Sequence, residues 1–208
     1  MIKVIAIIAM VMAHVGYLYF PQSDLLRAIG RLAFPLFAWG ITFGFKHTKN
    51  IKKYMIRVLL LAILSQYPYY LLFNMGYLNV CFTLFAGLVI LKIYEGTFHN
   101  ITKVLLIIMV FVIADIFSFE YGMYGLATIL IFYIFGLKPY SIFFHLIITI
   151  LGIHFYGYSM IQILSLFSFS LIFLFYKYDF KINRYISYGF YPLHLMVFLI
   201  VNTFFYDI

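Results

Sequence analysis

Long apolar runs separated by short polar turns make up almost the whole chain. A helix that crosses a bilayer needs about 20 mostly apolar residues, and it satisfies its own backbone hydrogen-bonding groups. Nine such runs lie at about Val4–Phe20, Ile29–Phe45, Tyr54–Phe73, Tyr77–Tyr94, Val104–Phe119, Gly122–Gly136, Tyr140–Phe155, Ser159–Tyr176 and Tyr185–Phe205. The pattern predicts an all-helical transmembrane bundle of about nine spans, with about eight to ten allowed because the sixth and seventh runs are short.

The basic residues lie mostly in the turns and indicate an orientation. Twelve of the 14 fall on the face that carries the amino terminus, and only Arg27 and Arg31 fall on the other. The positive-inside rule then places the amino terminus in the cytoplasm and the carboxyl terminus outside the cytoplasmic membrane.

Composition excludes a soluble fold, because 66% of the residues are hydrophobic and 10% are charged. We therefore expect a single membrane domain over residues 1–208. The net charge of +8 is spread over the turns instead of forming one patch. This distribution favours a lipid bilayer as the partner over a nucleic acid.

Polar groups at membrane depth are costly, so each is a candidate for function. His14 follows Lys3 by eleven positions, which places both on one helix face about 16.5 Å apart, with His14 near mid-membrane. This spacing suits a long ligand such as acetyl-CoA, whose phosphates would meet Lys3 while His14 acts as a general base. The alternative is that His14 hydrogen-bonds a neighbouring helix and Lys3 only anchors the cytoplasmic end.

Prolines stand beside polar groups in three of the predicted helices. Pro35 removes a donor for the carbonyl of Arg31, and Pro68 and Pro192 have the same effect in their helices. A substrate site is one interpretation, and helix packing or solvated interface residues are the other. Its candidates are Arg31, Gln66, Glu120, Tyr121, Tyr191 and His194. The spacing of His, Asp and Glu predicts no metal site.

Four stretches together resemble the TraX family, which is named for a conjugative-pilus pilin acetylase. They read KVIAIIAMVMAHVGYLYFP, RAIGRLAFPLFAWGITFGFKHTKNIKKYMIRVLLLAILSQYPY, FEYGMYGL and FYPLHLMVFLI. The family is distantly similar to the membrane-bound acyltransferase group 3, in which a basic residue precedes an essential histidine by eleven positions, as Lys3 precedes His14. An acid commonly stands just before that histidine, and here the position is Ala13.

The resemblance implies a transmembrane acetyltransferase with His14 as its catalytic histidine. Acetyl-CoA would bind from the cytoplasm against Lys3 and the basic loop, with Lys46, His47 and Arg57 as the further candidates. The acceptor would be a polypeptide amino terminus, in a pilin-like or secreted peptide, or a glycan hydroxyl. A small-solute transporter and a non-catalytic membrane assembly protein are the alternatives; the proline-kinked helices motivate the first and Ala13 the second.

The orientation can be tested by cysteine labelling at residue 49. We expect Lys49→Cys to react with a membrane-impermeant maleimide only when the cytoplasmic face is open to the reagent, because the loop from residues 46 to 53 is strongly basic. Labelling of intact cells from outside would reverse the predicted topology.

Overall fold

The computed structural model describes the backbone of residues 1–178 and 184–205 and the side chains of residues 1–178 and 188–204. Throughout these ranges the regular structure is helical, and one isolated bridge joins Leu78 to Phe119. The helices are α1 Ile2–Tyr19, α2 Asp24–Gly30, α3 Ala33–His47, α4 Ile51–Phe73, α5 Val80–Glu95, α6 Asn100–Ile116, α7 Gly122–Phe135, α8 Pro139–Tyr156, η1 Met160–Leu166, α9 Phe167–Phe175 and α10 Arg184–Phe205. The all-helical class is therefore confirmed.

Each of the nine apolar runs coincides with helical structure, but two are not the single helices expected. The run Ile29–Phe45 is interrupted between α2 and α3, and Pro35 lies in the first turn of α3, where its missing N–H breaks no intrahelical bond. The run Ser159–Tyr176 begins as the 3-10 helix η1 and continues as α9. Pro68 and Pro192, in contrast, lie within α4 and α10.

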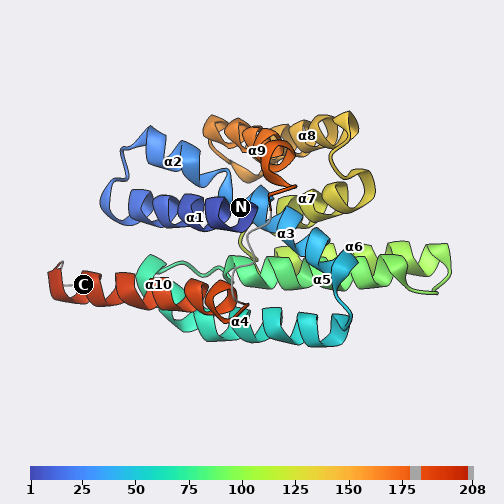
Figure 1. Ribbon diagram of the computed structural model, residues 1–208, viewed down its shortest axis with the longest axis horizontal. Helices are drawn as coiled ribbons and strands as arrows, with labels where there is room; N and C mark the ends of the chain where they lie inside the picture. Colours follow the sequence, from blue (N-terminus) through green and yellow to red (C-terminus); the bar gives the residue numbers. More distant parts are fainter. Residues whose placement is uncertain (179–183, 206–208) are drawn as a thin grey trace. The chain divides into compact units, whose positions relative to one another are not determined.

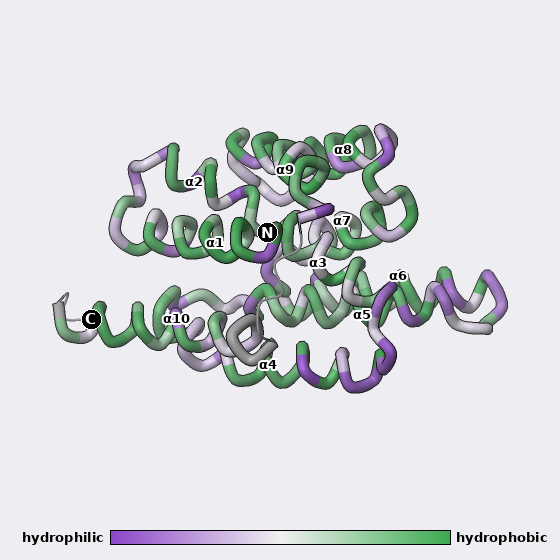
Figure 2. The backbone as a smooth tube through the Cα atoms, viewed as in Figure 1, coloured by the Kyte–Doolittle hydropathy of each residue, from purple (hydrophilic) through white to green (hydrophobic). Residues whose placement is uncertain are grey.

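The chain has the composition of a membrane protein on its surface as well as along its length. Four segments are long and apolar enough to cross a bilayer, namely Ile2–Tyr19, Asp24–His47, Ile51–Phe73 and Pro139–Tyr156, and shorter apolar helices accompany them. Figure 2 shows mostly hydrophobic helices, with hydrophilic residues gathered in turns and at helix ends. Large apolar side chains such as Phe155 and Phe204 are more than two-thirds exposed, as expected for surfaces that face lipid. The number of crossings and the side of the amino terminus stay predictions.

Packing divides the chain into two compact units, each built from two separate stretches. The first contains Met1–His47 and Tyr124–Phe180, and the second contains Thr48–Met123 and Lys181–Ile208. The expectation of one domain stays a prediction.

In the first unit, α1 and α2 form a closely packed antiparallel hairpin (Figure 1). A Cβ added to Gly16 would lie 2.8 Å from the Cβ of Leu26, and one added to Gly30 would lie 2.6 Å from the Cβ of Ala13. Glycine at these two positions lets the helix backbones approach closely. Around the hairpin, α3 packs on α1, and η1 packs on both α2 and α8.

In the second unit, α4 packs against α5 and α10, and α5 packs against α6 (Figure 1). The turn before α5 is joined to the segment after α6, because the N–H of Leu78 donates to Ser118 and the N–H of Glu120 donates to Leu78. Asn79 is fully buried and donates to the carbonyl of Ala62 and to the side chain of Gln66. These bonds fix the end of the unit where α4, α5 and α6 meet.

The close α1–α2 contact predicts different outcomes at two glycines. Gly30→Ala should lower the stability by about 1–3 kcal/mol, because its Cβ would overlap Ala13. Gly40→Ala in α3 is the matched control, since a Cβ there meets no atom within 4 Å and alanine favours the helix by about 0.5–1 kcal/mol. Thermal unfolding in detergent compares the variants, and equal melting temperatures would contradict the close contact.

Candidate functional site

His14 and Lys3 belong to one uninterrupted helix, so the spacing that links them is kept. α1 contains no proline and runs from Ile2 to Tyr19. Lys3 is exposed near its start, while His14 is half-buried toward its end. Their separation of eleven residues places both on the same face of α1, about 16.5 Å apart along the axis.

The residue before His14 lies at the closest approach of α1 and α2. Ala13 faces Gly30 across this contact. A longer side chain at position 13 would therefore enter the tightly packed space between the two helices. His14 itself has polar or aromatic interactions in the structure. His14 therefore lies next to the point where the backbones of α1 and α2 approach most closely.

Arg31 follows Gly30 directly, so the same contact holds this arginine near the hairpin. Its backbone N–H donates to the carbonyls of Arg27 and Ala28, at 3.2 Å each. The side chain of Arg31 is half-buried. Its Nε atom is shielded from solvent and has no hydrogen-bond partner among the described residues. A buried guanidinium N–H favours an anionic or carbonyl oxygen as its partner.

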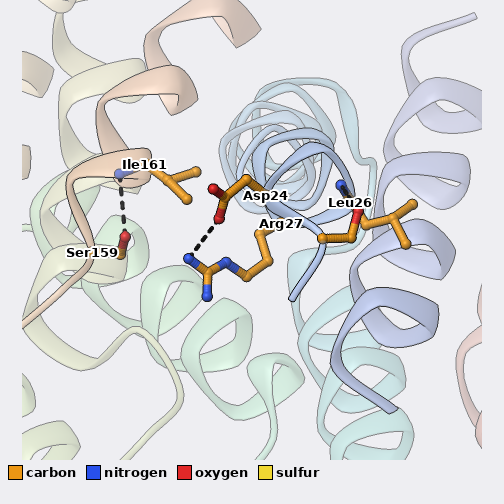
Figure 3. Close-up of polar contacts among 6 residues, drawn as sticks. Asp24, Leu26, Arg27, Ser159 and Ile161 are labelled. Atoms are coloured by element: carbon orange, nitrogen blue, oxygen red, sulfur yellow. Dashed lines mark hydrogen bonds and ion pairs between the residues drawn. The ribbon is translucent and has the colours of Figure 1, made fainter. Parts of the chain in front are cut away.

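Arg27, one turn earlier, is occupied differently. Its guanidinium lies 2.9 Å from the carboxylate of Asp24 at the start of α2, in an exposed pair (Figure 3). Figure 3 also shows Ser159, which caps η1 by accepting from the N–H of Ile161. Of the two arginines, Arg31 is therefore the better candidate for contacting a ligand.

Lys46 and His47 occupy the last turn of α3, in the first unit with Lys3 and His14. The Lys46 Nζ donates to the carbonyl of Tyr133 at 3.0 Å and lies 4.5 Å from the centre of its ring. His47 donates from Nδ1 to the carbonyl of Phe43 and stacks on that residue's ring. Both side chains are exposed and basic at the end of the helix where a positive charge is favourable.

Arg57 and Gln66 lie on α4, in the second unit. The Arg57 Nε donates to the carbonyl of Lys53, and its guanidinium lies 5.7 Å from the ring centre of Tyr188. Gln66 donates to the carbonyl of Tyr77 and accepts from the backbone and side chain of Asn79. Gln66 therefore holds the turn before α5 in addition to any role in binding.

Glu120 serves the start of α5. Its carboxylate accepts from the N–H of Val80 at 3.0 Å, and its carbonyl accepts from the hydroxyl of Thr83. A carboxylate at a helix amino terminus is stabilised by the unsatisfied N–H groups there. Tyr121 follows with a φ of 63°, in the left-handed region, so the chain turns sharply before α7.

Tyr191 and His194 are buried on α10, at 6% and 8% exposure. The Tyr191 hydroxyl has no hydrogen-bond partner within the described part of the chain, and it lies within electrostatic reach of Glu120 and Tyr121. His194 bonds from Nδ1 to the carbonyl of Phe190 and stacks on its ring. The second unit thus draws Glu120, Tyr121 and Tyr191 together, whereas His14, Lys3, Arg31, Lys46 and His47 belong to the first.

One polar cluster was not selected from the sequence as a site. Tyr124, His145, Gln162 and Ser165 are all buried in the first unit and hydrogen-bond to one another. His145 and His154 are nine residues apart and therefore lie on different faces of α8. The sequence around His145 did not indicate which residues on other helices it would contact. The available signal was the polar row Gln162, Ser165 and Ser168 in an otherwise apolar run.

Comparison with known proteins places the chain in a family. The model of the TraX protein family matches residues 1–202. A probable fimbrial assembly protein FimC, serogroup H1, of Dichelobacter nodosus is 33% identical over 123 residues, which cover 51% of this chain and 50% of that protein. The chain thus spans about half the length of the curated relative it matches. No solved structure matches it.

The family match covers nearly the whole chain, including α1 with His14, the α1–α2 hairpin, and α10 through His194. The family match agrees with the resemblance that the four sequence stretches indicate. This chain belongs to the TraX protein family.

Proposed function

We propose that this protein is a transmembrane acetyltransferase that moves an acetyl group from cytoplasmic acetyl-CoA to an acceptor on the outer side of the cytoplasmic membrane. The observation that supports this most is the placement of His14. His14 lies on the same unbroken helix as Lys3. It directly follows Ala13, which contacts Gly30 of α2, and Arg31 directly follows Gly30. Membership of the TraX family supports the same chemistry.

Basic side chains of the first unit would hold the donor. Lys3, Lys46 and His47 are exposed, and the ammonium groups of the two lysines suit the phosphates of coenzyme A. Arg57 of the second unit, also exposed, stays a further candidate for the same role. The thioester would extend along α1 from Lys3 toward His14, a distance that an extended pantetheine arm can bridge.

At His14 the imidazole would take the proton of the acceptor amine or hydroxyl as the acceptor attacks the acetyl carbonyl. The new acyl bond forms while the C–S bond breaks, and the leaving thiolate receives the proton from the imidazole. Arg31 has a buried N–H suited to the oxyanion that develops on the carbonyl oxygen. Each group named here belongs to the first unit.

We infer that the acceptor is a secreted or envelope polypeptide, with a glycan hydroxyl as the other choice. The support is the similarity to a probable fimbrial assembly protein, since fimbriae are built from exported polypeptides. Gln66, Glu120, Tyr121, Tyr191 and His194 are the candidates for holding it. The buried Tyr191 hydroxyl and the Glu120 carboxylate could bond an amine or an amide.

Donor binding predicts thermal stabilisation of the purified protein. Acetyl-CoA at 100 times its dissociation constant should add about 2.7 kcal/mol to the free energy of unfolding. A melting scan in detergent at millimolar acetyl-CoA measures the shift, and Lys3→Gln should reduce it because one phosphate contact is lost. An unchanged melting temperature in the unsubstituted protein would argue against the donor.

Loss of the imidazole predicts loss of transfer without loss of folding. His14→Ala should reduce acetyl transfer by about 100-fold or more, the usual contribution of a general base, while donor binding is largely kept. His154→Ala is the matched control, because His154 is exposed at the end of α8 and makes an edge-to-face contact with its neighbour Phe155. Transfer of radiolabelled acetyl groups to an envelope extract gives the rate, and turnover retained by His14→Ala would remove His14 from this role.

A further inference from the structure

The helix α4 has two sharply different faces. One face contains Val58, Ala62 and Ser65, which are at most 3% exposed, because the helix packs against α5 and α10 in the second unit. The opposite face follows the helical period and is exposed over most of the length of α4. This exposed stripe consists of Lys52, Lys53, Ile56, Leu60, Ile63, Tyr67 and Tyr70.

Charge and polarity change along the exposed stripe. Lys52 and Lys53 stand in the first turn of α4, where Asn50 caps the helix by accepting from the N–H of Lys53. The side chains that follow are each more than 50% exposed, first three aliphatic ones and then two tyrosines. Figure 2 shows hydrophilic residues at the amino end of α4 and mostly hydrophobic residues after them. The stripe is therefore basic at one end, aliphatic in the middle and aromatic at the other end.

The length of the exposed stripe matches one crossing of a bilayer. Lys52 and Tyr70 are 18 positions apart, which is about 27 Å along the helix axis. The hydrocarbon core of a bilayer is about 30 Å thick, and tyrosines are enriched where this core meets the headgroups. With Tyr67 and Tyr70 at one headgroup layer, the ammonium groups of Lys52 and Lys53 lie at the other.

The two lysine charges are not neutralised within the protein. No Asp or Glu occurs between Asp24 and Glu95 in the sequence, so the first turn of α4 has no acidic residue. Among the residues that the structure describes, neither ammonium group forms a hydrogen bond or an ion pair. Positive charge at the amino end of a helix also does not favour the helix itself. The pair of lysines therefore favours an anionic partner from outside the protein.

Arg57, one turn further along α4, shows the contrast. Its Nε donates to the carbonyl of Lys53, and its guanidinium lies 5.7 Å from the centre of the Tyr188 ring. Tyr188 belongs to α10 in the same unit. The charge of Arg57 is thus held against a neighbouring helix, whereas Lys52 and Lys53 point outward.

We propose that Lys52 and Lys53 bind the phosphate of an anionic phospholipid whose acyl chains lie along Ile56, Leu60 and Ile63. A lysine ammonium group is a compact point charge, and its long stem reaches from an apolar surface to the headgroup layer. The predicted orientation puts the amino end of α4 at the cytoplasmic leaflet, whose surface is negative because it holds anionic lipids. This binding does not depend on acetyl transfer.

Lipid titration followed by native mass spectrometry tests the site. The delipidated protein in detergent is titrated with phosphatidylglycerol, which is anionic, or with phosphatidylcholine, which has no net charge. We expect phosphatidylglycerol to bind more tightly. Lys52→Gln/Lys53→Gln should weaken its binding by about 30-fold, which is about fivefold for each lysine, and leave phosphatidylcholine binding unchanged. Lys52→Arg/Lys53→Arg keeps both charges and should keep the binding.

Lys92→Gln/Lys103→Gln is the matched control. It also removes two charges from the second unit, one in the last turn of α5 and one near the start of α6. Both lysines lie on the predicted cytoplasmic face, so we expect this variant to bind phosphatidylglycerol as the unsubstituted protein does. An equal loss in the two glutamine variants overturns the proposal, and so does equal affinity of the unsubstituted protein for the two lipids. If Lys52→Gln/Lys53→Gln does not fold, as judged by its melting transition, the two single variants decide.

Acetyl-CoA separates the lipid from the proposed donor, because both carry phosphate. Lys52→Gln/Lys53→Gln should keep the rise in melting temperature that acetyl-CoA causes. Loss of that rise in this variant assigns the two lysines to coenzyme A and overturns the lipid as their partner. An absent rise in the unsubstituted protein counts against the proposed acetyltransferase function, and the lipid titration then decides the lipid site alone.

Discussion

Backbone hydrogen bonding in an apolar solvent is the constraint on which this structure depends. A bilayer offers no partner to an exposed N–H or C=O group, so the chain must satisfy these groups within each segment. The helices do so, and the turns that interrupt them carry the charged residues. Where the backbone departs from an α-helix, between α2 and α3 and in η1, polar side chains lie beside the break.

The same solvent allows apolar side chains on the surface as well as in the core. Large hydrophobic groups are exposed, and the core holds hydrophobic residues together with several hydroxyls, amides and two imidazoles. Each buried polar group costs free energy unless it finds a partner, so such groups gather in sets. In the second unit the set is Gln66, Asn79 and Glu120, which tie the turns around α5. In the first unit it is the cluster around His145.

Small residues position the candidate chemistry of the first unit. Gly16 and Gly30 let α2 lie directly on α1. At the contact between Gly30 and Ala13, His14 is the next residue on α1, and Arg31 is the next residue after α2. At the position just before this histidine, Ala13 faces Gly30 of α2, where a longer side chain would meet the close helix contact. The proposed role of His14 needs only that its imidazole acts as a general base.

Local sequence was enough to predict the helical membrane class, the position of nearly every helix, the family, and the spacing of Lys3 and His14. These follow from local composition and from the 3.6-residue period, which do not depend on how helices pack. Which polar groups meet, in contrast, depends on how the helices pack. Gln66 and Glu120 were expected to contact substrate, and packing showed that they also hold the turns around α5. His145 and Ser165 are 20 residues apart on different elements, and their hydrogen bond arises because η1 packs on α8 with a period of three.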